Sequence, residues 1–279
     1  LELFQDTELN LTMSYRYRKE DNNIPILFLH GFNGNSKSWG YQFNFFKNKK
    51  SVIAVDAPGF GKSDPADLDM KIIADLVKRL LKSINISECH VVGHSMGGML
   101  AQVIACNHTE LVKKIILSCT HTGYAFPKGT SLREVYTRRL EERKKLSDLE
   151  YGKLRVREML PSLKEEEIFL FLASISGEIS EGSIKSGGMA MQLLDTTKYL
   201  SNLKQQCLII KASDDKVVSK ELSLSLEKKI PHAEIKELSN VGHAPYCEDI
   251  CFDFRKFVLP WKKQTIHFHI TPCDSILKG

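Results

Sequence analysis

Largely apolar runs alternate along this chain with stretches of helical periodicity. Residues 24–29, 51–55, 112–118 and 207–212 form such runs, and each is followed by a polar or glycine-containing loop. Runs of this length are typical of strands buried on both faces of a parallel sheet. Residues 8–18 alternate weakly between apolar and polar positions, which predicts a half-buried antiparallel edge strand.

Helical patterns separate these runs. Residues 69–84 carry apolar side chains three and four positions apart, which predicts an amphipathic helix. Helices are also predicted for residues 98–105 and 220–228. The repeated order of strand, loop and helix predicts an α/β fold, with a mostly parallel, doubly wound sheet.

This order breaks near residue 123. Residues 131–167 contain ten Lys/Arg and nine Asp/Glu side chains, and this mixture predicts a solvated helical surface. An apolar helix is expected at residues 168–172, followed by a connection of small residues at 182–188. We therefore predict that residues 124–195 form a helical insertion.

The order resumes towards the end of the chain. A short strand is expected at residues 233–238 and a closing helix at 248–258, so the compact core ends near residue 261. The tail, residues 262–279, has no assigned role. His267 and His269 lie on the same face of one predicted strand. No third metal ligand accompanies them, so we expect no metal site there.

Composition narrows the functional classes. The 279 residues carry a net charge of +5, with basic and acidic residues interspersed, and we expect no nucleic-acid or membrane partner. The seven cysteines have no metal-site spacing and favour a reducing compartment. Residues 1–6 lack the features of a signal peptide, so we expect a cytoplasmic location.

One motif carries chemistry: Gly93-His94-Ser95-Met96-Gly97, which lies between a predicted strand and a predicted helix. A sharp strand-to-helix turn lifts the serine Oγ clear of the backbone, and small flanking residues make that turn possible. The motif also occurs in ordinary loops, so a nucleophilic role for Ser95 requires a base and an acid elsewhere in the chain. The glycine, lysine and serine at 61–63 do not form a phosphate-binding loop, because Asp56 stands where that motif requires glycine.

The partners of Ser95 are expected at the carboxyl ends of other strands. His243 follows the last predicted strand and has Gly242 and Pro245 beside it, which makes it the best candidate base. Asp214 and Asp215 follow the strand at 207–212, and either could orient the histidine.

The order of these groups resembles that of the α/β-hydrolase superfamily from about residue 8 to residue 260. The resemblance rests on five motifs, namely His30-Gly31-Phe32, residues 56–63, residues 93–98, residues 212–218 and residues 240–245. It implies the α/β-hydrolase fold with a helical cap insertion, and an acid at Asp215, three residues before Val218. Ala212 departs from the glycine that is usual in the family.

The resemblance also implies an oxyanion hole formed by the backbone N–H groups of Phe32 and Met96. It divides the chain into a core (1–123 and 196–261), a cap (124–195) and the tail (262–279). The motif forms are similar to those of carboxylesterases, 3-oxoadipate enol-lactonases and cofactor-free haloperoxidases.

We therefore expect a serine hydrolase that cleaves a small-molecule ester or lactone through Ser95, Asp215 and His243, without cofactor or metal. Two alternatives stay open: a carbon–carbon bond hydrolase acting on a small diketone, and a non-catalytic small-molecule receptor with the same fold. Neither the substrate nor the oligomeric state follows from the sequence.

Overall fold

A computed structural model of the chain describes residues 1–20 and 24–248. The closing helix beyond residue 248 and the tail lie outside the described residues, so their predictions stay untested. In the described part, no helix combines the length and the apolar character needed to cross a membrane.

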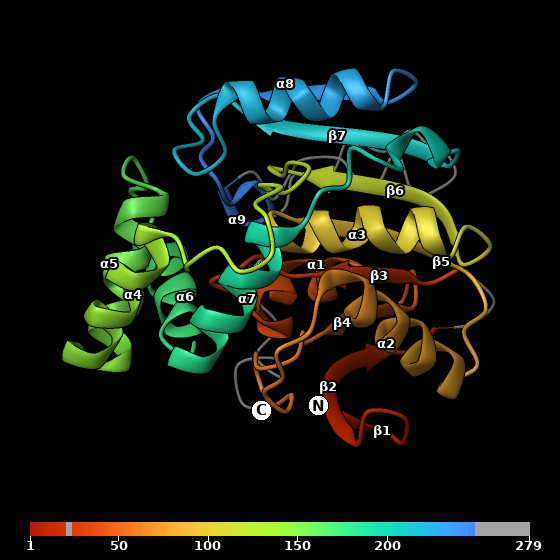
Figure 1. The fold of residues 1–279 in the computed structure, drawn as a ribbon, viewed down its shortest axis with the longest axis horizontal. Helices are drawn as coiled ribbons and strands as arrows, with labels where there is room; N and C mark the ends of the chain where they lie inside the picture. The colour runs from red at the N-terminus through yellow and green to blue at the C-terminus, as the bar shows by residue number, and fades with distance from the viewer. Residues whose placement is uncertain (21–23, 249–279) are drawn as a thin grey trace.

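An eight-stranded sheet forms the centre of the molecule (Figure 1). Its spatial order is β1-β2-β4-β3-β5-β6-β7-β8; β2 pairs antiparallel with both β1 and β4, and all other neighbouring strands pair in parallel. The strands are β1 (Glu2–Asp6), β2 (Leu11–Arg18), β3 (Ile26–Leu29), β4 (Val52–Val55), β5 (Cys89–His94), β6 (Val112–Ser118), β7 (Gln206–Ala212) and β8 (Glu234–Leu238).

The antiparallel strand predicted at residues 8–18 is present as β2, but its predicted edge position is wrong. Strand β2 pairs with β1 on one side and with β4 on the other, so β1 forms the edge of the sheet. Strand β1 was not predicted, because a five-residue strand with three exposed side chains and a buried aspartate at its end carries little hydrophobic pattern. Pairing on both sides also explains why most of β2 is buried.

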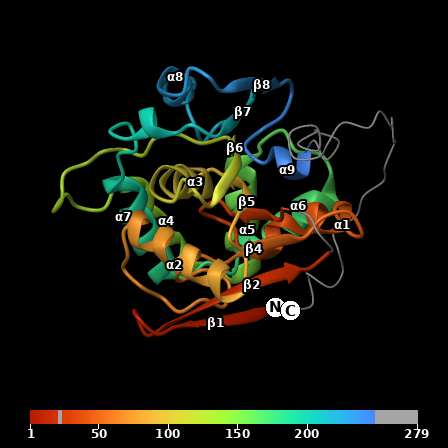
Figure 2. The same cartoon turned by 90° about the vertical axis from the view of Figure 1, so that its right-hand side faces the viewer.

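Helices cover both faces of the sheet (Figures 1 and 2). Leu27, Val91 and Ile115 point to one face and pack in one apolar cluster with α2 (Met70–Ser83), α3 (Met96–Asn107) and α8 (Lys220–Lys229). Their neighbours Phe28, Val92 and Ile116 point to the other face and pack with η1 (Ser36–Trp39), α1 (Gly40–Phe45) and α9 (Pro245–Glu248). This alternation buries both faces, as the continuously apolar strands predicted.

Four helices lie in sequence between β6 and β7: α4 (Glu134–Lys145), α5 (Asp148–Met159), α6 (Glu166–Ser176) and α7 (Glu181–Leu193). In Figure 1, α4, α5 and α6 lie together to one side of the sheet. The chain enters and leaves this region at adjacent points, since Thr196 N–H donates to the Thr122 carbonyl at 2.9 Å. A short η2 (Leu200–Asn202) then leads to β7.

The predicted connection at residues 182–188 is wrong, because these residues lie inside α7. Its glycines are explained by packing rather than by a turn. A Cβ on Gly188 would lie 2.9 Å from the Tyr136 ring, and one on Gly187 would lie 3.0 Å from the Phe32 ring. The small residues therefore let α7 approach two aromatic side chains.

Candidate active site

The carboxyl ends of the parallel strands bring the predicted site residues to one edge of the sheet. Leu29 pairs with Gly93, His94 with Ser118, and Ala212 with Leu238, so these strands end nearly in register. The loops that follow carry Phe32, Ser95, Cys119, Asp215 and His243. In open parallel sheets, reacting groups gather at this edge.

Ser95 occupies the turn between β5 and α3. Its backbone is in the left-handed region (φ 51°, ψ −116°), and its N–H donates to the Ser118 carbonyl at 2.9 Å. Only small residues fit around this turn. A Cβ on Gly97 would lie 2.1 Å from the Leu29 carbonyl oxygen, and one on Gly93 would lie 2.3 Å from the Gly97 oxygen. The glycines thus permit the strained geometry that exposes a nucleophile.

His243 and Asp215 form a hydrogen-bonded pair. The His243 Nδ1 lies 3.0 and 2.9 Å from the two carboxylate oxygens of Asp215. Oδ1 of Asp215 also accepts the N–H groups of Val217 and Val218 at 2.8 and 2.9 Å. Burial alone would raise the pKa of Asp215, but the charge of His243 and these hydrogen bonds lower it below its usual value. The carboxylate is therefore ionised and directs the Nδ1 proton.

The alternative acid, Asp214, is placed elsewhere. Its carboxylate accepts the Ser213 hydroxyl at 2.9 Å, whereas Asp215 contacts His243. The structure thus separates two neighbours that residue chemistry left equivalent.

Ser95 and His243 line the same cavity, of about 290 Å³, together with Gly31 and Phe32. A Cβ on Gly31 would lie 3.3 Å from the Ser95 Cβ, so the loop that carries Phe32 passes directly beside the serine. Met96 is the first residue of α3, where backbone N–H groups have no acceptor inside the helix. The loop that carries Phe32 and the first residue of α3 thus both adjoin Ser95, and the oxyanion role of their N–H groups stays a prediction.

Two further residues, His94 and Glu248, form hydrogen bonds with the backbone of the His243 loop. Neither was predicted as a site residue. The Nε2 of His94 donates to the His243 carbonyl at 2.6 Å, because a carbonyl oxygen can only accept. Burial lowers the pKa of His94 to about 3, so its ring is neutral. Glu248 accepts the N–H groups of Gly242 and Ala244 at 3.0 and 3.1 Å. The His94 contact joins residues 149 positions apart, and the Glu248 contacts come from a residue after the loop. No local sequence motif predicts either contact.

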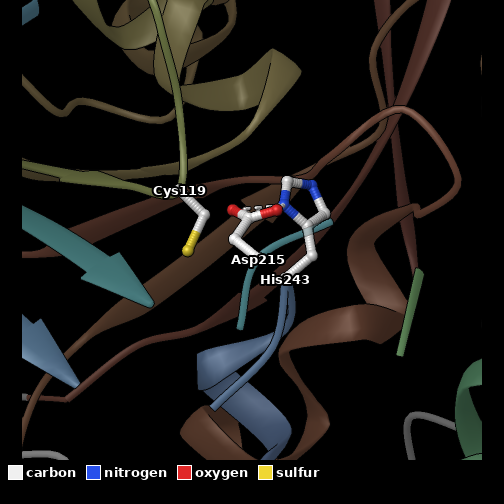
Figure 3. Close-up of side chains that lie close together, drawn as sticks. All are labelled: Cys119, Asp215 and His243. Atoms are coloured by element: carbon white, nitrogen blue, oxygen red, sulfur yellow. Dashed lines mark hydrogen bonds and ion pairs between the residues drawn. The ribbon is translucent and has the colours of Figure 1, made fainter. Parts of the chain in front are cut away.

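Cys119 completes a compact group with Asp215 and His243 (Figure 3). One ligand atom from each lies within 4.8 Å of the others, which is also a possible metal-ligand arrangement. Burial and the adjacent Asp215 carboxylate raise the pKa of the Cys119 thiol well above its usual value, so the thiol stays protonated. An ion would also have to break the Asp215–His243 hydrogen bond. The geometry thus fits an acid–base pair with a neighbouring thiol better than a metal site.

Comparison with known proteins agrees with this architecture. A sequence profile of the alpha/beta hydrolase fold matches residues 24–153. The carboxylesterase structure from Nitrososphaera gargenis superposes with a TM-score of 0.79 at 20% identity, covering 92% of this chain and 98% of the other. The chain therefore has the α/β-hydrolase fold.

Two further proteins are similar to this chain over most of its length. The enol-lactonase structure from Burkholderia xenovorans LB400 has a TM-score of 0.78 at 17% identity, with 92% and 98% of the two chains covered. The AB hydrolase superfamily protein YisY of Bacillus subtilis is 28% identical over 81% of this chain and 87% of its own length. The chain spans between 26% and 62% of the length of four other curated relatives.

Proposed function

We propose that this protein cleaves a small-molecule ester or lactone through an acyl-enzyme formed on Ser95. The observation that carries the proposal is the Asp215–His243 pair in the wall of the cavity that Ser95 lines. Because Nδ1 of His243 is bonded to the carboxylate, Nε2 is the nitrogen available as a base. Relatives of similar fold include a carboxylesterase and an enol-lactonase, which supports this reaction class.

In the proposed first step, His243 Nε2 accepts the Ser95 hydroxyl proton while Oγ attacks the carbonyl carbon. The N–H groups of Phe32 and Met96 donate to the oxyanion that forms. His243 then protonates the leaving alcohol oxygen as its bond to the acyl carbon breaks. For a lactone, that oxygen stays attached to the acyl group.

In the second step, His243 accepts a proton from water, whose oxygen attacks the acyl carbon. The collapse of this intermediate breaks the bond to Oγ and returns the proton to Ser95. Asp215 stays ionised throughout and stabilises the imidazolium form of His243.

Pre-steady-state kinetics with 4-nitrophenyl butyrate test this proposal. We expect a burst of nitrophenol equal to the concentration of active sites, followed by slower turnover. Ser95→Ala removes the nucleophile, so kcat should fall by at least about 10⁴-fold and the burst should vanish. Turnover of Ser95→Ala at the wild-type rate would contradict the proposal.

A further inference from the structure

The cavity beside Ser95 has an unusual balance of charge. Five cationic side chains and one anionic side chain line it: Arg133, Arg138, Arg139, Arg155, Lys216 and Glu158. Four of the arginines come from α4, α5 and the segment just before α4. The charge pattern of this region predicts a solvated surface; Arg138 is exposed as predicted, whereas the Arg155 side chain is fully buried.

Two of the arginines are neutralised within the protein. The Arg155 side chain is fully buried, and its Nη2 and Nη1 lie 2.7 and 3.2 Å from Glu142 and Glu158. Arg138 approaches the same two carboxylates at 3.6 and 3.5 Å. This four-residue network balances two positive with two negative charges.

Arg139 is outside this network. Among the described residues, no carboxylate lies within ion-pair distance of its guanidinium, and its buried Nε has no hydrogen-bond acceptor. Burial and the positive charge of Arg155 lower the pKa of Arg139. The Arg139 side chain is partly buried, and a desolvated cation without a counter-ion is costly, so a complementary anion would be favoured here.

The position of Arg139 connects it with the reaction centre. Its guanidinium lies over the Phe32 ring, 5.4 Å from the ring centre, and Phe32 belongs to the loop beside Ser95. Arg133 also lacks a carboxylate partner in the described chain, and its buried Nη1 has no hydrogen-bond acceptor, but it stacks at 3.9 Å on Tyr124 and not on the loop beside Ser95. Arg139 is therefore the cation best placed to bind an anionic substrate group.

We propose that Arg139 binds a carboxylate carried by the substrate while Ser95 attacks the ester or lactone carbonyl. The planar guanidinium matches a carboxylate through two parallel hydrogen bonds, and the aromatic surroundings strengthen them by excluding water. This inference rests on the proposed function, because it assigns the substrate class of the same site. It assigns Arg139 to substrate selection and gives it no part in the bond-breaking steps.

Matched pairs of esters test the inference. On the acyl side, mono-4-nitrophenyl glutarate and adipate are compared with 4-nitrophenyl valerate; on the alcohol side, 3-carboxyphenyl butyrate is compared with phenyl butyrate. We expect wild-type kcat/KM to favour the charged ester of at least one side by about tenfold or more. Arg139→Gln should abolish that preference, because it should lower kcat/KM for the charged ester by about tenfold more than kcat/KM for its neutral partner. Arg139→Lys should restore part of it.

Arg157→Gln is the matched control, because Arg157 is an exposed arginine of α5 that does not line the cavity. It should keep the full preference for the charged ester. Equal wild-type kcat/KM for charged and neutral esters, on both the acyl and the alcohol side, would overturn this inference but not the proposed function. So would an equal loss on both esters in Arg139→Gln, which indicates a structural role.

Free ligands distinguish the type of anion. Glutarate should inhibit hydrolysis of the neutral ester more strongly than inorganic phosphate, and Arg139→Gln should remove the difference. Stronger inhibition by phosphate would overturn the carboxylate assignment. Absence of hydrolysis and of burst with every ester would overturn the proposed function, and the inference with it.

Discussion

The paired contact between Asp215 and His243 shows how individual residues define this site. Two backbone amides and the histidine converge on one carboxylate, and together they outweigh the effect of burial on its pKa. A carboxyl whose pKa is lowered stays ionised as the pH falls to about 4, the value of an ordinary Asp. Asp215 therefore keeps its orienting role throughout the pH range in which histidines titrate.

This assignment predicts the acid side of the pH profile. Three histidines line the cavity, and burial lowers the pKa of His94 to about 3 and of His121 to about 4. Both are neutral above pH 5, so the protonation of a single catalytic base should control the acid side of the profile. We expect log(kcat/KM) to fall with a limiting slope of one as the pH decreases. A limiting slope of two in that range would contradict the assignment.

Residue chemistry explains which parts of the site were predictable. Ser95, His243 and the aspartate pair follow predicted strands, so their convergence at one sheet edge could be expected. The choice of Asp215 came from the family pattern, and its geometry agrees with that choice. Arg139 could not be found, because ion pairing to residues distant in sequence decides which arginines of a mixed charge run are left without partners.

At the scale of elements, the turn between β5 and α3 depends on close packing against β3. The Leu29 carbonyl lies where a Cβ of residue 97 would be, and backbone cannot move aside as a flexible side chain can. The same reasoning explains residues 182–188, which were predicted as a connection but lie in α7, where glycines also allow close packing. Glycine in a sequence therefore predicts either a turn or a close approach, and tertiary contacts decide between them.

A pair of glycine substitutions tests whether close packing requires the glycine at position 97. Gly97→Ala should lower the free energy of unfolding by about 1–3 kcal/mol or prevent folding, because the added methyl overlaps the Leu29 carbonyl. Gly182→Ala, in α7, meets only the Ser180 Oγ at 3.6 Å and should raise stability by about 0.5 kcal/mol. Urea denaturation measures both, and a stable Gly97→Ala protein would contradict the packing.

At the scale of the whole molecule, a sheet with two apolar faces holds the site, and the helices between β6 and β7 supply much of the cavity wall. The order of strands and helices could be predicted because period and hydrophobicity encode it locally. How α4–α7 pack against the sheet could not, since helix surfaces with mixed charge do not show which side is buried. The division into a core and a cap at residues 124–195 stays a prediction.

The central claim is that Ser95 is a nucleophile activated by His243. Labelling with a fluorophosphonate probe, followed by peptide mass mapping, tests it most directly. We expect one adduct per chain, located on Ser95, with labelling lost in Ser95→Ala and slowed by about 100-fold or more in His243→Gln. An unlabelled wild-type protein, or an adduct on another residue, would contradict the account and favour a receptor role for this fold.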